Sequence, residues 1–301
     1  MIFFAIPFYK NVGFLEDTLK SLLNQTSEDW NAVVLDDSID NGEAAQAKKL
    51  IENLNDSRIK YQKNIQNIGM GNNWNQGLEL GRKHSKAIAT TILHADDRLL
   101  PEYVASMLGA LDHSPNTTAF FCETVVIDEN GKRLFSFADY YKTFLLPKKK
   151  NGVITLNGIE GIAPLIPGNF IFCPTLCYRN SRLERLFDAN LKMVIDFEYT
   201  LDLLIHGHQL KGLYSKPLFE YRRHSSSTTN LMNQNLERFK EEKFLYFQIA
   251  KKLDAKGCYK LAKKARQMKI VKRNLLFQIT SSFLRCRFSL ANRYLQYYLS
   301  L

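Results

Sequence analysis

The sequence predicts an α/β fold, a Rossmann-like arrangement in which a mixed, mainly parallel sheet is flanked by helices. Over residues 1–115, short apolar runs alternate with segments whose apolar residues recur at helical spacing. This alternation is typical of βαβ units around a parallel sheet. Polar clusters follow the apolar runs directly, at the strand ends where such sheets form their binding sites.

Each element of this first segment is expected from its local pattern. Short apolar runs predict buried strands over residues 2–8, 30–35, 59–62 and 87–93. Apolar residues at helical spacing predict helices over residues 15–23, 45–53, 74–82 and 102–111. The last helix follows Pro101, and proline is favoured in a first helical turn.

Residues 116–230 have a different pattern, with shorter apolar runs and more turn residues. A β-hairpin is expected over residues 120–137, turning at Asn130 and Gly131. Further strands are expected over residues 169–178, 210–214 and 218–221. A helix over residues 199–205 should end at Gly207. The pattern of residues 231–301 predicts a helical C-terminal extension that breaks near Gly257.

The net charge of +11 is concentrated in this extension. Residues 231–301 hold 16 Lys+Arg and 4 Asp+Glu, whereas residues 1–230 hold 25 and 26. Such asymmetry predicts an anionic partner for the extension, and its aromatic residues favour an anionic membrane surface. A helical cap with a solvated basic face is the alternative. We expect no nucleic-acid partner, because the remaining chain is neutral and contains no recognised binding module.

The chain shows no signal peptide and no apolar segment long enough for a membrane span. We therefore expect a cytoplasmic protein that is soluble or attached peripherally to the inner face of the membrane. Its five cysteines are an odd number, and a reducing compartment would keep them as thiols. Cys173 and Cys177 lie in a strand-like run and are expected to be buried thiols rather than zinc ligands.

Two pairs of carboxylates follow predicted strands. Asp96 and Asp97 come directly after the strand ending at residue 93. Paired carboxylates at such a position can bind a divalent cation that prefers oxygen ligands, Mn²⁺ or Mg²⁺. The alternative is a cap for the following helix. Asp36 and Asp37 follow the strand of residues 30–35 and present the same two possibilities.

The order and spacing of the motifs resemble the family 2 glycosyltransferases of the GT-A fold. The resemblance covers residues 2–229. Its blocks are residues 6–11 and 15–26, Val33-Val34-Leu35-Asp36-Asp37-Ser38, Asn67-Ile68-Gly69 with Asn75-Gln76-Gly77-Leu78, His94-Ala95-Asp96-Asp97 and Tyr221-Arg222-Arg223-His224. The resemblance implies a nucleotide-sugar-binding half at residues 1–115, an acceptor-binding half at residues 116–230, and an added basic helical extension at residues 231–301.

The resemblance also implies a set of donor-site residues. Donor binding is expected of Pro7, Tyr9, Asp36, Asn67, Asn75, Asp96 and Arg222. The metal, Mn²⁺ or Mg²⁺, is expected on Asp96, Asp97 and His224. His94 stands where the family frequently has an aspartate, which leaves open whether Asp96 or Asp97 is the ligand.

Asp196 is the expected catalytic base, because the family often carries Glu-Asp at this helix start. Here Ile195 replaces the glutamate. A base must take the proton of the acceptor hydroxyl as its oxygen attacks the anomeric carbon. A helix N-cap is the alternative role for Asp196, and Glu198 is a second candidate base.

The resemblance implies transfer of a sugar from a nucleoside diphosphate sugar to a glycan or lipid-linked glycan, with inversion. UDP is the commonest nucleotide in the family, and GDP and dTDP are the alternatives. Bacterial surface polysaccharide or lipopolysaccharide assembly is the setting that the resemblance implies. The alternative is a degenerate protein of this fold that binds without turnover, since His94 and Ile195 depart from the usual motifs. A nucleotidyltransferase is disfavoured, because the first strand is not followed by a glycine cluster.

Overall fold

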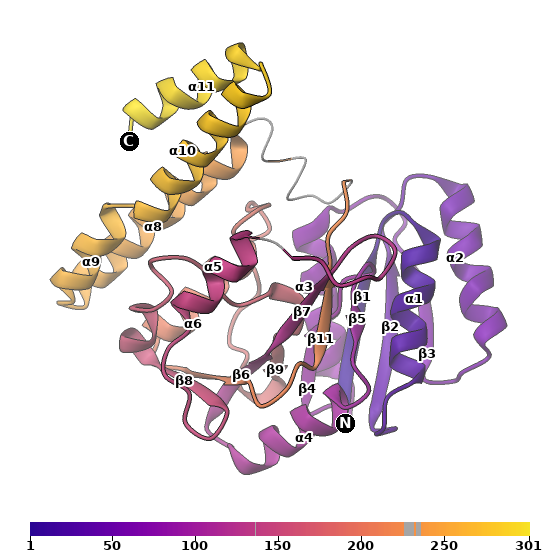
Figure 1. Ribbon diagram of the computed structural model, residues 1–301. Coiled ribbons are helices and arrows are strands. Elements are labelled where there is room, and N and C mark those ends of the chain that lie inside the picture. Colours follow the sequence, from indigo (N-terminus) through magenta and orange to yellow (C-terminus); the bar gives the residue numbers. More distant parts are fainter. Residues whose placement is uncertain (136, 226–231, 233–235) are drawn as a thin grey trace.

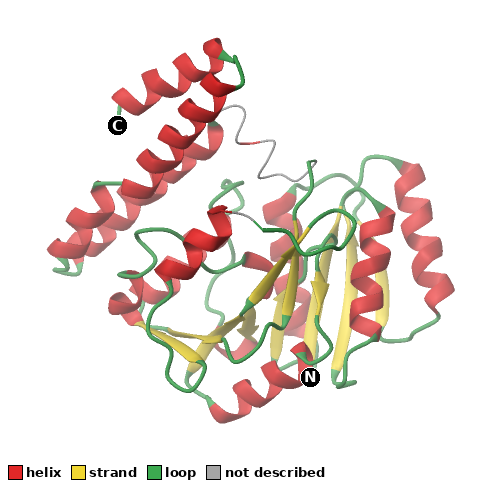
Figure 2. Cartoon of the chain, viewed as in Figure 1, coloured by secondary structure: helices red, strands yellow, loops and turns green. Residues whose placement is uncertain are grey.

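The computed structural model describes residues 1–135, 137–225, 232 and 236–301. An eight-stranded sheet runs through the larger part of the chain in the order β3-β2-β1-β4-β9-β6-β10-β8 (Figure 1). Its strands are β1 (Ile2–Phe8), β2 (Trp30–Asp36), β3 (Ile59–Lys63), β4 (Ala89–Ile92), β6 (Thr117–Cys122), β8 (Val153–Asn157), β9 (Cys177–Arg179) and β10 (Gln209–Leu213). The predicted α/β class is confirmed: helices flank a mixed, mainly parallel sheet (Figure 2).

The first four strands of the sheet are parallel, and the helices between them cover both of its faces. β1 pairs in parallel with β2 and β4, and β2 pairs in parallel with β3. The helices of this region are α1 (Val12–Leu23), α2 (Asn41–Leu54), α3 (Met70–Lys83) and α4 (Tyr103–His113). Every strand and helix predicted from residues 1–115 is present, with ends shifted by a few residues.

Alternate side chains of β1 enter two different cores, as the period of two in a strand requires. Phe4 and Ile6 pack with Leu19 of α1 on one face. Ala5 packs with Leu78 of α3 on the other face. At Gly77, α3 lies so close to β1 that an added Cβ would be 2.4 Å from the Cβ of Ala5.

A second, three-stranded sheet has the order β5-β11-β7. Its strands are β5 (Arg98–Leu99), β7 (Thr124–Ile127) and β11 (Phe219–Arg222). β11 pairs antiparallel with β5 and parallel with β7. This small sheet joins the residues after Asp97 to the segment that begins at Phe219.

Two predictions for residues 116–230 are wrong. The hairpin prediction fails because the chain changes sheets at Glu123, so that β6 and β7 belong to different sheets. The expected turn forms, with an isolated bridge between Ile127 and Arg133, but the return strand is replaced by α5 (Phe137–Leu145); Ser136 lies outside the described residues. The predicted strand over residues 169–178 is a loop with a short 3-10 helix, and only its end forms β9.

The other predictions for this region agree with the structure. The predicted helix is α6 (Ile195–Ile205), which is followed by Gly207 with a φ of 85°. The last two predicted strands are β10 and β11. The sequence pattern missed β5, β8 and α5, which are short or lack a clear apolar period.

The C-terminal extension is helical, as predicted, although its first residues include positions outside the described ones. It contains α8 (Glu237–Ala255), α9 (Tyr259–Arg266), α10 (Lys269–Leu284) and α11 (Phe288–Leu299). The expected break occurs at Gly257, and further breaks occur at Met268 and Cys286, which have positive φ. Leu253 and Leu275 share a core cluster with Leu204 of α6. The extension therefore packs on the α/β part of the chain, residues 1–225. Among the described helices, none combines the length and apolarity that a membrane span needs.

Candidate functional site

Asp36 and Asp37 end β2 and use their carboxylates differently. Asp36 is fully buried. It accepts from the Tyr61 hydroxyl at 2.5 Å and from the Ser38 backbone N–H at 2.8 Å. The Lys63 ammonium lies 3.6 Å away. Burial and the Asp36 carboxylate raise the pKa of Tyr61 above its ordinary range, so the phenol keeps its proton and donates.

Asp37 organises the loop between β3 and α3. Its carboxylate accepts from the backbone N–H groups of Ile68 and Gly69, both at 2.9 Å. It also accepts from the side-chain amides of Asn64 and Asn67, both at 2.9 Å. The predicted donor residue Asn67 is therefore held in place by Asp37. The sequence pattern allowed Asp37 to bind a cation or to form a cap or turn, and in the structure its carboxylate binds backbone and side-chain N–H groups of this loop.

The predicted donor residue Asn75 is engaged with the backbone of Phe187. Its amide donates to the carbonyl oxygen of Phe187 at 3.0 Å and accepts from the N–H at 2.8 Å. This pair fastens α3 to the loop before α6. In this arrangement the Asn75 side chain holds the backbone of Phe187 in place. The donor-binding role of Asn75 stays a prediction.

Pro7 and Tyr9 lie at the carboxyl end of β1, as the strand prediction required. The Tyr9 ring is 44% exposed, and the Lys10 ammonium lies 5.0 Å from its centroid. Tyr9 and Lys10 line a cavity together with Ile39, Asp40 and Glu43. This cavity therefore lies between the ends of β1 and β2, where a base or ribose can be accommodated.

His94, Asp96 and Asp97 form a cluster of potential metal ligands. One ligand atom from each lies within 4.8 Å of the others. Among the described residues, two buried atoms of this cluster have no hydrogen-bond partner, Nε2 of His94 and Oδ2 of Asp97. Since buried polar atoms are normally paired, these orphaned atoms fit a bound cation. Carboxylate oxygens with an imidazole nitrogen suit Mn²⁺ and accept Mg²⁺.

His224 approaches the same cluster from the segment after β11. Its Nε2 lies 2.8 Å from Oδ2 of Asp96. Burial opposes ionisation of Asp96, but the contacts with His224 and His94 outweigh it and lower the pKa of Asp96. Burial, together with the charge of Asp96, raises the pKa of Asp97 well above its ordinary value, and burial lowers the pKa of His94. A divalent cation would relieve the cost of charging Asp97.

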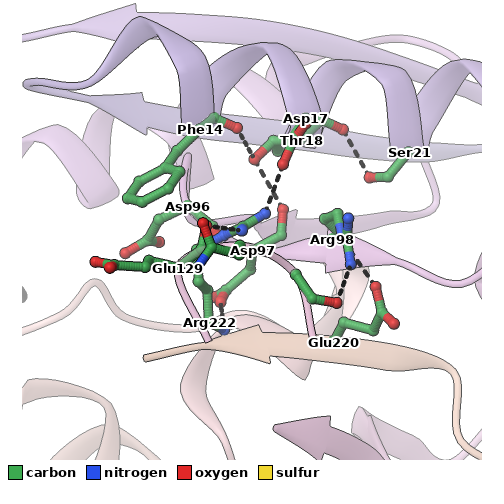
Figure 3. Close-up of polar contacts among 12 residues, drawn as sticks. Phe14, Asp17, Thr18, Ser21, Asp96, Asp97, Arg98, Glu129, Glu220 and Arg222 are labelled. Atoms are coloured by element: carbon green, nitrogen blue, oxygen red, sulfur yellow. Dashed lines mark hydrogen bonds and ion pairs between the residues drawn. The ribbon is translucent and has the colours of Figure 1, made fainter. Parts of the chain in front are cut away.

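Arg222 is buried under this cluster and donates to protein oxygens from every guanidinium nitrogen (Figure 3). Nε donates to the backbone oxygen of Asp96 at 2.7 Å. The two terminal nitrogens donate to the backbone oxygen of Glu129 at 2.9 Å and to the carboxylate of Asp17 at 2.8 Å. The Arg222 backbone N–H donates to Asp97 at 2.7 Å. Arg222 therefore stabilises the segment that contains Asp96 and Asp97. Its contact with a donor stays a prediction.

Asp196 lies in the first turn of α6. Burial raises the pKa of Asp196 to about 6, a value suited to a general base near neutral pH. Burial also raises the pKa of the Cys173 thiol, and the charges of Asp196 and Asp97 add to that effect. Asp196 therefore combines a raised pKa with a position in the first turn of α6.

Glu198, the second candidate base, is engaged in ion pairs. The Arg185 guanidinium contacts its carboxylate directly. The Lys252 ammonium lies 3.7 Å from it. These cations hold Glu198 at the contact between α6 and α8. Asp196 therefore remains the better placed base.

Sequence comparisons relate the chain to known glycosyltransferases. The sequence profile of "Glycosyl transferase family 2" matches residues 3–163. An uncharacterized glycosyltransferase of Methanocaldococcus jannaschii, MJ1057, is 31% identical over 124 residues, which are 41% of each chain. The aligned part of the chain thus spans less than half the length of this relative.

Solved structures show the same fold. S. aureus TarS 1-349 matches with a TM-score of 0.63 at 18% identity, over 94% of this chain and 74% of that chain. TarS 1-349 in complex with UDP-GlcNAc matches with a TM-score of 0.56 at 15% identity, over 99% and 91%. TarS 1-349 in complex with UDP matches with a TM-score of 0.57 at 18% identity, over 84% and 72%. The fold is therefore GT-A, and the chain belongs to glycosyl transferase family 2.

Proposed function

We propose that this protein transfers a sugar from a UDP-sugar to an acceptor hydroxyl, with inversion at the anomeric carbon. The observation that carries the proposal is the cluster of His94, Asp96 and Asp97 just after β4, in which two buried ligand atoms lack a hydrogen-bond partner among the described residues. The TarS complexes with UDP and with UDP-GlcNAc support a uridine donor, because TarS and this chain share the same fold.

The donor would bind across the carboxyl ends of β1, β2 and β4. Tyr9 lines the cavity, Pro7 and the buried Asp36 lie at the ends of β1 and β2 beside it, and Asn67 lies on the loop that Asp37 holds. Asp96, Asp97 and His224 would hold Mn²⁺ or Mg²⁺, and His94 adds an imidazole within reach. When bound, the cation neutralises negative charge on the departing diphosphate.

Asp196 acts as the base in this proposal. At neutral pH a carboxyl with a pKa of about 6 is mostly ionised and still basic enough to accept a proton. It takes the proton of the acceptor hydroxyl while the hydroxyl oxygen forms its bond to the anomeric carbon. The bond to the diphosphate oxygen breaks on the opposite face, so a single displacement inverts the configuration.

The extension supports a membrane-linked acceptor. Between residues 255 and 301 the chain has no Asp or Glu and has eleven Lys or Arg. At the turn between α10 and α11, Phe283, Leu284 and Phe288 are mostly exposed, next to the exposed Arg285 and Arg287. Exposed apolar side chains among cations suit an anionic bilayer surface. We propose peripheral attachment at the inner membrane face, with a glycan or lipid-linked glycan acceptor in bacterial surface polysaccharide or lipopolysaccharide assembly.

Calorimetric titration of UDP in the presence of Mn²⁺ and in the presence of EDTA tests the donor site. We expect micromolar binding that needs the metal and is lost in Asp96→Ala. Release of UDP from UDP-GlcNAc then tests turnover; binding without any turnover across UDP-sugars and acceptors would favour the degenerate alternative.

Co-sedimentation with vesicles tests the membrane surface. We expect the protein to bind vesicles of anionic phosphatidylglycerol and not to bind vesicles of phosphatidylcholine, which have no net charge. Replacing Phe283, Leu284 and Phe288 together by serine should abolish binding. Equal partitioning of the variant and the wild type would overturn the membrane proposal.

A further inference from the structure

A carboxylate of the C-terminal extension accepts hydrogen bonds from the backbone just before α6. Glu241, in α8, accepts from the N–H of Lys192 at 3.1 Å, of Met193 at 2.7 Å and of Val194 at 3.3 Å. The helix has no capping side chain of its own at Val194. Backbone N–H groups at a helix start are otherwise unpaired and carry partial positive charge. Glu241 therefore supplies, from a distant part of the chain, the cap that α6 lacks.

The same helix start carries Asp196. The backbone N–H groups of Phe197 and of Asp196 itself oppose the effect of burial and lower the pKa of this carboxyl. The N–H groups that Glu241 binds, those of residues 192–194, immediately precede the first turn of α6. The orientation of the Asp196 side chain depends on how the segment before it is held.

Further contacts keep α8 against α6 beyond this cap. The rings of Phe197 and Tyr246 lie 6.4 Å apart. The Lys252 ammonium lies 2.5 Å from the buried carboxylate of Asp202. Glu241 is therefore presented by a helix that is fixed along α6 at several points, so its carboxylate has little freedom to leave the cap.

We propose that Glu241 is a positioning residue for the catalytic base, and that it makes the C-terminal extension a working part of the active site. The inference rests on the proposed role of Asp196. Glu241 occupies N–H groups that could otherwise turn toward the Asp196 carboxylate and stabilise its ionised form. By binding these N–H groups, Glu241 fixes the orientation of the Asp196 side chain and keeps its carboxylate basic.

Other charged and titratable groups also face Asp196. Lys142 of α5 lowers its pKa. The Cys173 thiol and the Tyr178 hydroxyl, from the residues before β9 and from β9 itself, are affected by its charge. Replacing Glu241 also removes its negative charge, which alone would lower the pKa of Asp196. Glu241→Gln removes the same charge as Glu241→Ala but keeps an acceptor oxygen, so a difference in the pKa of Asp196 between these two variants reports the helix start.

The test compares Glu241→Ala and Glu241→Gln with Glu237→Ala. Glu237 is an exposed residue of the same helix whose carboxylate pairs with Lys240, so it controls for loss of a glutamate from α8. Hydrogen exchange reports the amides of residues 192–194. Carbon-13 NMR of aspartate-labelled protein reports the pKa of Asp196, with its signal assigned by its absence in Asp196→Asn.

We expect Glu241→Ala to accelerate exchange of these amides about tenfold or more. The pKa of Asp196 should fall by about half a unit. Glu241→Gln keeps an acceptor oxygen, so the amides of residues 192–194 should keep most of their protection from exchange. Glu237→Ala should match the wild type in both measurements. If Glu241→Ala also matches the wild type in both, the proposal is overturned.

Release of UDP from UDP-GlcNAc separates this inference from the role of Asp196. Loss of release in Asp196→Asn, together with a kcat about 10- to 100-fold lower and a nearly unchanged donor KM in Glu241→Ala, would support both. If Asp196→Asn releases UDP normally, the base assignment is wrong, whatever the exchange data show. If Asp196→Asn is inactive and Glu241→Ala has the wild-type kcat, only the positioning role fails.

Discussion

Nε2 of His224 lies 2.8 Å from Oδ2 of Asp96, although 128 positions separate the two residues in the chain. The small sheet explains the contact. β11 pairs with β5, which begins immediately after Asp97, and the backbone N–H of Arg222 donates to the Asp97 carboxylate. The pairing of two short strands thus carries His224 to the acidic motif.

This contact predicts how metal binding will respond to substitution. His224→Ala should weaken Mn²⁺ binding about 10- to 100-fold, because it removes an imidazole from the Asp96 carboxylate. Asp96→Ala should weaken it further. Electron paramagnetic resonance of free Mn²⁺ measures the affinity. Asp112→Ala, which removes an exposed carboxylate of α4, is the control, and equal affinities for all three variants would place the metal elsewhere.

The raised pKa of Asp196 predicts opposite effects of pH on activity and on stability. The turnover number should rise as pH passes through about 6, because the base must be ionised. The Asp196 carboxyl binds its proton more tightly in the folded protein than in the unfolded chain. Its favourable contribution to the free energy of unfolding is therefore complete below the unfolded pKa of 3.8 and is lost as pH rises to about 6. Asp196→Asn should therefore increase the free energy of unfolding at pH 8 by about 1–3 kcal/mol.

Urea unfolding at pH 8 and at pH 4 measures this difference between Asp196→Asn and the wild type. The gain in the free energy of unfolding should shrink at pH 4, where the wild-type carboxyl is protonated in the folded protein and partly protonated in the unfolded chain. A variant that is less stable than the wild type at pH 8 would contradict the assignment of burial as the cause of the shift.

Arg222 should contribute strongly to stability. Arg222→Met removes the cation that pairs with Asp17 and leaves the backbone oxygens of Asp96 and Glu129 without these donors. Breaking such a buried ionic network typically costs about 3–5 kcal/mol. Urea unfolding measures the loss, and Arg82→Met at an exposed position of α3 should change stability by less than about 0.5 kcal/mol. Similar losses in both variants would show that the network contributes little.

Two glycines in helices provide a matched test of packing. Gly77→Ala places a Cβ 2.4 Å from that of Ala5, so α3 must move away from β1, and overpacking of this kind costs about 1–3 kcal/mol. Gly109→Ala in α4 meets nothing within 4 Å and should stabilise the protein by about 0.5–1 kcal/mol. Thermal unfolding should shift in opposite directions, and stabilisation by both substitutions would contradict the close packing of α3.

Local patterns predicted every strand and helix of residues 1–115 except β5. Burial on a sheet face imposes a period of two or a continuous apolar run, and burial of a helix face imposes a period near 3.6. Such periods can be recognised in consecutive residues. β5 was missed because two residues carry no period, whereas β8 was missed although its buried and exposed residues alternate. The predicted hairpin failed because a local pattern does not show that a strand leaves one sheet for another.

The chain's own motifs indicated which carboxylates could bind metal or accept a proton, since residue type and position after a strand are local properties. They did not indicate that Asp37 holds the loop of Asn67, or that Glu241 binds the backbone that leads into the helix of Asp196. Each of these relationships joins residues from different elements. They depend on sheet pairing and helix packing between distant segments, and this long-range geometry arises only when the whole chain has folded.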